Sequence, residues 1–360
     1  MGYELEFIGV NEETKDATSI CVRWKKDDNY YVKGVFDGGF KKHGEQVVSH
    51  LNQYYLSDEN DSIDFVICSH PHKDHSSGLK EILENVKVKT LYMNRPWVHI
   101  ESLYDKVNDG RITKESLKKR LKESYTYISE LESIAEEKNI PIFDIFQGDV
   151  IENKLTVLSP SKEFYLDLLV ESNKTPLEED RSLIEFLESQ FTKIISKIKE
   201  SWSDEKLRED VETEPDNETS TVILGDMDKE RFLLTGDAGI RALREAIDYS
   251  ESISKSIKEN VQIYEMPHHG GRHNVSPSIL NDLLGDIVTE GELVNKKAFV
   301  CSGKNSDHPL QMVVNAFIRR GVKVYNASGN TIRHSRDMDD RSGWTTAKNL
   351  AFNSDVEEWH

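Results

Sequence analysis

Three histidines and one aspartate lie within six residues, in the segment His70-Pro-His72-Lys-Asp74-His75. An apolar run at residues 63–68 precedes this segment and predicts a buried strand. Polar side chains at this density, directly after a strand, indicate a metal site at the edge of a sheet. We expect His70 and His72 to hold one metal and Asp74 and His75 to face a second, and this donor set suits zinc, iron or manganese. The alternative is a solvated loop rich in histidine, which this order of residues after a strand disfavours.

The six-residue segment resembles the HxHxDH signature of the metallo-β-lactamase superfamily. Further segments resemble other landmarks of that family in the expected order: residues 36–39 the early DTG turn, residues 233–237 the aspartate-bearing strand, and residues 266–270 the HHGS element. Residues 217–220 resemble the NxxS stretch, and residues 300–309 the SxGxxNxxGHP element, of the soluble hydrolase domain of ComEC-type competence proteins. The resemblance extends over residues 3–334 and is interrupted by one insertion.

This resemblance implies an α/β protein with a four-layer αββα sandwich and a binuclear metal-dependent hydrolase activity. It implies two divalent metal ions, with zinc expected first and manganese or iron as alternatives. Asp237 is placed to bridge the two cations, which such sites hold about 3.5–4 Å apart. The expected metal ligands are His70, His72, Asp74, His75, Asp237 and His268. The residues expected to act in catalysis are Asp74, His269 and His308, the two histidines by contacting substrate or by protonating a leaving oxygen.

Two positions depart from the family pattern. The family's third-motif histidine is expected between the first motif and Asp237, yet the chain has no histidine between His99 and His268. ComEC-type proteins resemble this chain in that respect, so water, substrate or Asn217 is left to complete the first metal site. The second departure is Gly271, which stands where the family commonly has serine.

The resemblance to ComEC-type proteins implies hydrolysis of phosphodiester bonds, with DNA as the leading substrate. One alternative is a hydrolase of a small phosphodiester, such as a nucleotide signal. Another is a sensor or effector subunit of low activity that binds a protein partner through its insertion. All three hypotheses use the same metal site, so the site residues alone do not distinguish between the substrates.

Composition and charge restrict the partners and the cell compartment expected for this protein. The 360 residues carry a formal net charge of −19, which argues against broad adhesion to anionic membranes or nucleic acids. No apolar run reaches the length needed to cross a bilayer, and the first residues lack the basic start of a secretory signal. Cys21, Cys68 and Cys301 lie singly within apolar runs and are expected to be core thiols. These features predict a cytoplasmic protein without a membrane partner.

The ordered motifs predict one hydrolase domain over residues 1–350, an acidic helical insertion at residues 161–220 within it, and a C-terminal tail at residues 351–360. Within the insertion, apolar residues from Leu183 to Trp202 recur at helical spacing, and the acidic residues 203–218 are expected to form a mobile loop. The helix would bind a protein partner, cover the metal site, or simply cover a sheet edge.

Two further expectations concern single elements. The spacing of apolar residues predicts one amphipathic helix over residues 113–138, and Pro309 is expected to begin a helix that continues to Arg320. Basic residues outnumber acidic ones over residues 319–348. If this basic strip borders the metal cleft, it is expected to steer a phosphate-bearing substrate inward.

Overall fold

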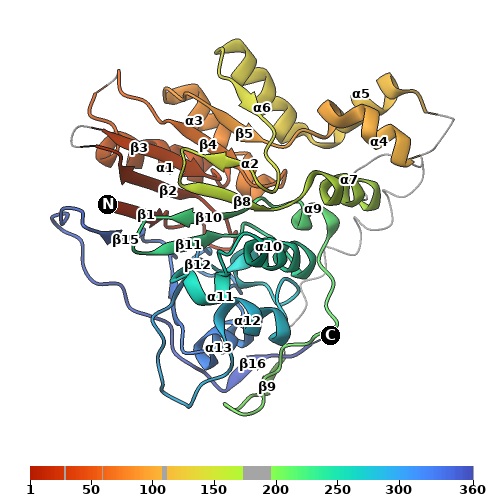
Figure 1. Cartoon of the computed structure of the whole chain (residues 1–360). Helices are drawn as coiled ribbons and strands as arrows, with labels where there is room; N and C mark the ends of the chain where they lie inside the picture. The colour runs from red at the N-terminus through yellow and green to blue at the C-terminus, as the bar shows by residue number, and fades with distance from the viewer. Residues whose placement is uncertain (28–29, 59, 108–111, 173–195, 360) are drawn as a thin grey trace.

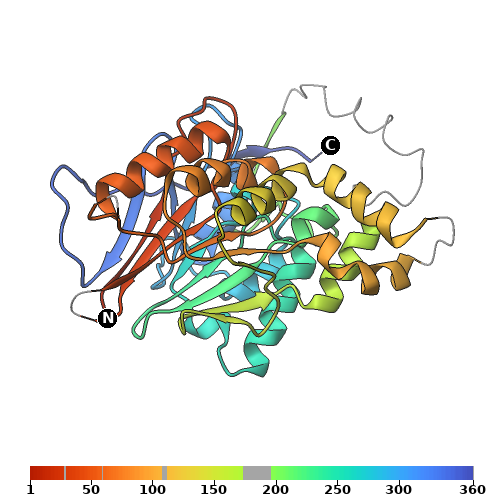
Figure 2. The ribbon, with the colours of Figure 1, turned by 90° about the horizontal axis from the view of Figure 1, so that it is seen from above.

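The computed structural model describes residues 1–27, 30–58, 60–107, 112–172 and 196–359. Two seven-stranded sheets pack face to face, and helices cover both outer faces (Figure 1). Seen from above, the helices of the first half of the chain lie across the strands beneath them (Figure 2). The expected α/β fold with four αββα layers is therefore confirmed.

The first sheet runs in the order β15-β1-β2-β3-β4-β5-β6. Its first strands are antiparallel, whereas β3 to β6 are parallel and therefore end at the same edge. The strands are β1 (Tyr3–Phe7), β2 (Ile20–Lys25), β3 (Tyr31–Phe36), β4 (Phe65–Cys68), β5 (Leu91–Met93), β6 (Ile142–Phe143) and β15 (Ile332–Arg336). The helical elements that follow these strands are α1 (Lys41–Tyr54), α2 (Lys73–Ser76), α3 (Leu79–Asn85), η1 (Pro96–His99), α4 (Ile100–Val107), α5 (Lys114–Ser124) and α6 (Thr126–Glu137).

The second sheet runs in the order β14-β13-β12-β11-β10-β8-β7, and β11 to β14 are parallel. The strands are β7 (Val150–Ile151), β8 (Leu155–Ser159), β10 (Val222–Asp226), β11 (Arg231–Leu234), β12 (Ile263–Glu265), β13 (Lys297–Val300) and β14 (Lys323–Asn326). The helical elements of this half are α7 (Lys162–Glu171), α9 (Pro215–Glu218), α10 (Ile240–Ser252), α11 (Ile257–Asn260), η2 (Pro267–Gly270), α12 (Pro277–Leu284) and α13 (Gln311–Arg319).

Aromatic side chains from both sheets fill the space between them. Phe7 stacks on Phe299 with ring centroids 4.6 Å apart, and Trp24 and Phe65 pack in the same layer. Full burial of such a side chain contributes about 1.5–3 kcal/mol, so this layer holds the two sheets in a fixed relation. Separate apolar clusters join each sheet to its own helices.

Two helix predictions need correction. The single helix expected over residues 113–138 is two helices, α5 and α6, because Tyr125 leaves helical geometry at φ −99° and ψ 56°. Its hydroxyl is buried and donates to Ser172 and Asp216, which fixes the break. The helix expected to begin at Pro309 instead begins at Gln311, with Leu310 at its N-cap.

The insertion also differs from expectation where the structure describes it. Most of the predicted apolar helix, up to residue 195, lies outside the described residues. The prediction of a helix is wrong for the last part of this stretch, because Lys197–Lys199 form strand β9. This strand pairs with β16 (Asp355–Glu357), which lies more than 150 residues further along the chain. The expected tail at residues 351–360 thus includes a paired strand.

The segment expected as an acidic mobile loop is tied to the second half of the molecule. Glu205 forms an ion pair with Arg320 at 2.8 Å, Leu207 is buried, and the segment ends in α9. Just before it, Glu200 pairs with the fully buried Arg319 at 3.1 Å. The carboxylates of Glu200 and Glu205 thus serve as partners for two arginines and hold this acidic part of the chain against the second half of the molecule.

The arginines of the basic strip at residues 319–348 form ion pairs with carboxylates of the protein, and no residue of the strip lines the cleft described below. Besides the two pairs above, Arg333 contacts Glu4 at 2.5 Å and Arg341 contacts Glu6 at 2.7 Å. Both of these carboxylates are fully buried.

Among the described residues, no helix is both long and apolar enough to cross a lipid bilayer. Cys21, Cys68 and Cys301 are buried free thiols, as expected.

Candidate metal centre

The predicted metal-binding residues come together where strands of both sheets end. Asp37 follows β3 and residues 69–75 follow β4, whereas Asp237 lies three residues beyond β11 and residues 268–269 follow β12. Each of these strands has a parallel neighbour, so the polar segments emerge at one edge of the sandwich. Ligand sites form at such edges because the strand ends converge there while the chain changes direction.

Three buried histidines share one arrangement: the Nδ1 atom is tied to a protein acceptor and the Nε2 atom is not. The Nδ1 partners are the Ser69 hydroxyl for His70 at 3.0 Å, Asp37 Oδ2 for His75 at 2.7 Å, and the Cys301 carbonyl oxygen for His269 at 2.9 Å. All three Nε2 atoms are buried without a hydrogen-bond partner among the described residues. In its neutral form, a ring held through Nδ1–H presents an unprotonated Nε2, which is the state that binds a metal ion.

The carboxylate of Asp237 lies among these histidines and is 1% exposed. Its Oδ1 atom is 3.0 Å from His75 Nε2, and its Oδ2 atom is 3.5 Å from His70 Nε2 and 3.3 Å from His268 Nδ1. Oδ1 has no hydrogen-bond partner in the described part of the chain. Unpartnered buried donors and acceptors are costly, and a cation between them removes that cost.

Two groups of candidate ligand atoms share Asp237. One group is His70, His72 and Asp237, and the other is Asp74, His75, Asp237 and His269. We expected His268 beside Asp74 and His75, with His269 facing the substrate. The structure instead brings His269 to that group, with its Nε2 atom 3.4 Å from Asp74 Oδ2.

His268 stands at the wall of the cleft, where its Nδ1 atom is 3.1 Å from the amide nitrogen of Asn217. His269 thus takes the place that was expected for His268, and the backbone of η2 explains why. His268 and His269 have φ values of 47° and 53°, a left-handed conformation that non-glycine residues rarely adopt. Two such residues in succession turn the neighbouring rings apart, with an interplanar angle of 75°.

The electrostatics of the site favour cations. Burial opposes charging of His75, but the carboxylates of Asp237 and Asp37 outweigh it and raise the pKa of His75 well above its ordinary value. Burial likewise opposes ionisation of Asp237, yet the surrounding histidines hold its pKa well below the usual range. For His269, burial is outweighed by Asp74 and Asp237, which raise its pKa to about 9. The carboxylates are therefore ionised and attract positive charge to this point.

The short helix α9 lies beside the first ligand group, for which the sequence offers no third-motif histidine. The Asp216 carboxylate lies 3.6 Å from His72 Nε2, and it accepts hydrogen bonds from Ser172 at 2.6 Å and Tyr125 at 3.1 Å. The next residue, Asn217, is buried beside His268. Sequence patterns did not single out Asp216, because the partners that position it come from α7 and from the break between α5 and α6.

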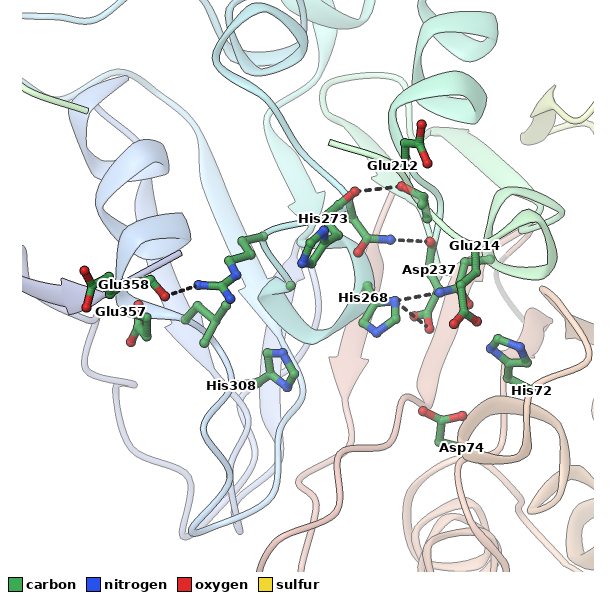
Figure 3. A pocket seen from close by; sticks show the side chains of 16 residues that line it. His72, Asp74, Glu212, Glu214, Asp237, His268, His273, His308, Glu357 and Glu358 are labelled. Carbon is green, nitrogen blue, oxygen red and sulfur yellow. Dashed lines mark hydrogen bonds and ion pairs between the residues drawn. The ribbon is translucent and has the colours of Figure 1, made fainter. Parts of the chain in front are cut away.

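A cleft of about 670 Å³ opens onto these ligands (Figure 3). His308 stands on the side that carries Glu357 and Glu358, across from His72. Asp74, Asp237 and His268 line the inner part, whereas none of the arginines of the basic strip lines the cleft. Acidic side chains predominate among those exposed at its margin, namely Glu212, Glu214 and Glu358, while Glu357 is buried beside them and Arg272 is the arginine among the lining residues.

A model of the metallo-beta-lactamase superfamily matches residues 26–155, which include strands β3 to β6 and the first metal-binding segment. Over these residues the chain is similar to that superfamily, whose members are mostly metal-dependent hydrolases, and its two sheets with covering helices are consistent with the superfamily's sandwich fold. The further resemblance to ComEC-type proteins remains a prediction from the sequence motifs.

Solved structures with similar folds include Tm1679, described as a metal-dependent hydrolase of the beta-lactamase superfamily. It is 11% identical, with 94% of this chain and 100% of that chain covered and a TM-score of 0.43. Zinc-bound PqqB from Methylobacterium extorquens is 11% identical, with 92% and 99% covered and a TM-score of 0.41. A putative metallo-beta-lactamase from Thermotoga maritima is 13% identical, with 66% and 79% covered and a TM-score of 0.32. No curated protein matches the sequence.

Proposed function

We propose that this protein is a binuclear metal-dependent hydrolase that cleaves phosphodiester bonds in small molecules. The observation that carries the proposal is the convergence of three buried, unpartnered Nε2 atoms, from His70, His75 and His269, around the carboxylate of Asp237. Imidazole nitrogen and carboxylate oxygen form a donor set that suits zinc, with manganese or iron as alternatives. The residues therefore fit the two metal ions that the family implies.

In this proposal His70 and His72 would hold one cation and Asp74, His75 and His269 would hold the other, with Asp237 belonging to both groups. Two cations held in this way supply Lewis acidity and an activated water at neutral pH. The protein's own side chains prepare the site for this chemistry. The anchored imidazoles keep their Nε2 atoms aimed inward, and the buried carboxylate of Asp237 offsets the repulsion between the two positive charges.

The choice of a small diester over DNA is supported by the charges around the cleft. Glu212, Glu214 and Glu358 are exposed at its margin and would repel the backbone of a nucleic acid. The basic strip was expected to steer a phosphate-bearing substrate inward, but its arginines form ion pairs within the protein. A cleft of about 670 Å³ lies in the size range of small-molecule sites.

The test uses metal-stripped protein reloaded with zinc or manganese. Its substrates are bis(p-nitrophenyl) phosphate, a linear dinucleotide, single-stranded and duplex DNA, RNA, and a lactone. We expect metal-dependent turnover of the two small diesters, and its loss in His70→Ala. His273→Ala is the matched control, because His273 lines the same cleft but belongs to neither ligand group. Turnover of DNA faster than that of the small diesters would favour the nuclease hypothesis. Turnover of the lactone alone would exclude phosphodiester hydrolysis.

A further inference from the structure

A carboxylate from the first part of the chain contacts the histidine on the cleft wall. Asp16 lies in the loop between β1 and β2, and its Oδ2 atom accepts a hydrogen bond from His308 Nδ1 at 2.9 Å. The two residues are 292 positions apart in the sequence. The same carboxylate accepts from the Ser306 hydroxyl at 2.8 Å and from the Gly303 backbone N–H at 2.9 Å.

The loop that carries Asp16 also contacts the metal-binding segments. Two residues further on, the backbone N–H of Thr18 donates to the carbonyl oxygen of Asp74 at 3.2 Å. The Thr18 hydroxyl lies 3.4 Å from Nδ1 of His269. One short loop therefore sets the position of His308 relative to the candidate ligands of the second metal.

We propose that Asp16 is a positioning residue that holds His308 as the proton donor to the leaving oxygen. This inference rests on the proposed phosphodiesterase function. His308 lines the cleft together with Asp74 and His268, and its ring centroid is 6.4 Å from that of His268. Because Nδ1 is bonded to Asp16, Nε2 is the nitrogen of His308 that can serve a substrate in the cleft. The hydrogen bond from Nδ1 to the Asp16 carboxylate fixes the orientation of the ring.

The proposed step balances in atoms and charge. The oxygen of a water molecule forms a new bond to phosphorus and releases one proton to solvent, and the bond between phosphorus and the leaving oxygen breaks. The leaving oxygen takes the proton from Nε2 of the His308 imidazolium. His308 becomes neutral with its remaining proton on Nδ1, still donated to Asp16, and regains the lost proton from solvent.

The other hydrogen bonds of Asp16 define the competing explanation, in which this residue only braces the loop at residues 303–306. The backbone N–H of His308 also donates to the Ser306 hydroxyl at 3.1 Å. Ser306→Ala therefore removes two loop contacts and leaves the Asp16–His308 pair in place. This variant is the matched control for damage to the loop.

The kinetic experiment compares Asp16→Asn, His308→Ala, the double variant and Ser306→Ala on two diesters. Bis(p-nitrophenyl) phosphate loses a nitrophenolate that needs no proton, whereas the dinucleotide ApA loses an alkoxide that does. General acid catalysis contributes on the order of 10²–10⁴-fold, and we expect Asp16→Asn to lose on the order of 10–100-fold of it on ApA, with little loss on the nitrophenyl ester. The double variant should be no slower than His308→Ala. Equal losses on both substrates, or additive losses, would overturn the proposal.

A second measurement does not depend on turnover. The ¹⁵N and ¹H resonances of the His308 ring report which nitrogen carries the proton, and we expect protonated Nδ1 in the parent protein, with that signature lost in Asp16→Asn and kept in Ser306→Ala. A ring that is unchanged in Asp16→Asn would overturn the positioning role even in an active enzyme. Absence of hydrolysis by the metal-loaded parent would instead refute the proposed function, so the two failures are distinguishable.

Discussion

Asp37 supports both candidate metal positions without facing the cleft itself. Its Oδ2 atom accepts a hydrogen bond from His75 Nδ1 at 2.7 Å and another from the Ser69 hydroxyl at 2.6 Å. That hydroxyl lies 3.0 Å from His70 Nδ1 and accepts from it. One fully buried carboxylate therefore sets the ring orientation of a histidine in each ligand group.

Replacement of Asp37 by asparagine tests whether this carboxylate orients the two histidines, and it changes the side-chain volume very little. The Ser69 backbone N–H already donates to Oδ1 at 2.7 Å, so the new amide nitrogen takes the place of Oδ2 and presents N–H to His75. His75 then accepts at Nδ1 and carries its proton on Nε2, the atom that should bind metal. Loss of a supporting contact of this kind weakens metal binding about 10–100-fold, which corresponds to about 1.4–2.8 kcal/mol.

Metal affinity is measured by competition with a chromophoric chelator, with elemental analysis as a check on stoichiometry. We expect Asp37→Asn to weaken both bound metals. Ser69→Ala is the matched variant, because it removes the partner of His70 and keeps the contact between Asp37 and His75, so it should weaken one metal only. Two metals bound by Asp37→Asn with the parent's dissociation constants would refute the assignment of Nε2 as the ligand atom.

Three further predictions concern the bridge, proton release and stability. Asp237→Ala should lose metal and activity together, because the cations then repel each other without a shared carboxylate; elemental analysis that finds two metals per chain with normal turnover would exclude the bridging role. Because the pKa of His269 is raised to about 9, a metal ion must displace a proton from its imidazole below that pH. Metal affinity should therefore rise about tenfold per pH unit between pH 6 and 9 for each proton released, and a flat profile in chelator competition would contradict the raised pKa. Glu200→Gln should lower the free energy of unfolding by about 3–5 kcal/mol, since it leaves the buried Arg319 without its charge partner, and urea denaturation with an unchanged midpoint would show that this pair contributes nothing.

Local patterns in the sequence predicted individual strands and placed the first group of candidate ligands after one of them, whereas the four-layer fold was implied by the resemblance of the ordered motifs to a known family. The segment from His70 to His75 follows a buried strand, and that order alone predicts polar ligands at the edge of a sheet. The apolar run at residues 63–68 predicted a strand, and the structure has β4 (Phe65–Cys68) in this region. Such features depend on neighbours within a few residues, which is why they can be recognised without knowledge of the tertiary structure.

Only the tertiary structure decided which atoms of these residues meet. The left-handed turn at residues 268–269 brings His269, and not His268, into the group with Asp74, and no local pattern distinguishes two adjacent histidines. The arginines of the basic strip look free in sequence because their carboxylate partners, such as Glu4, lie hundreds of residues away. Asp16 and His308 meet for the same reason, because packing joins segments that sequence spacing cannot relate. Strand periodicity therefore located the site, whereas the close packing of distant segments determined its ligands and its charge.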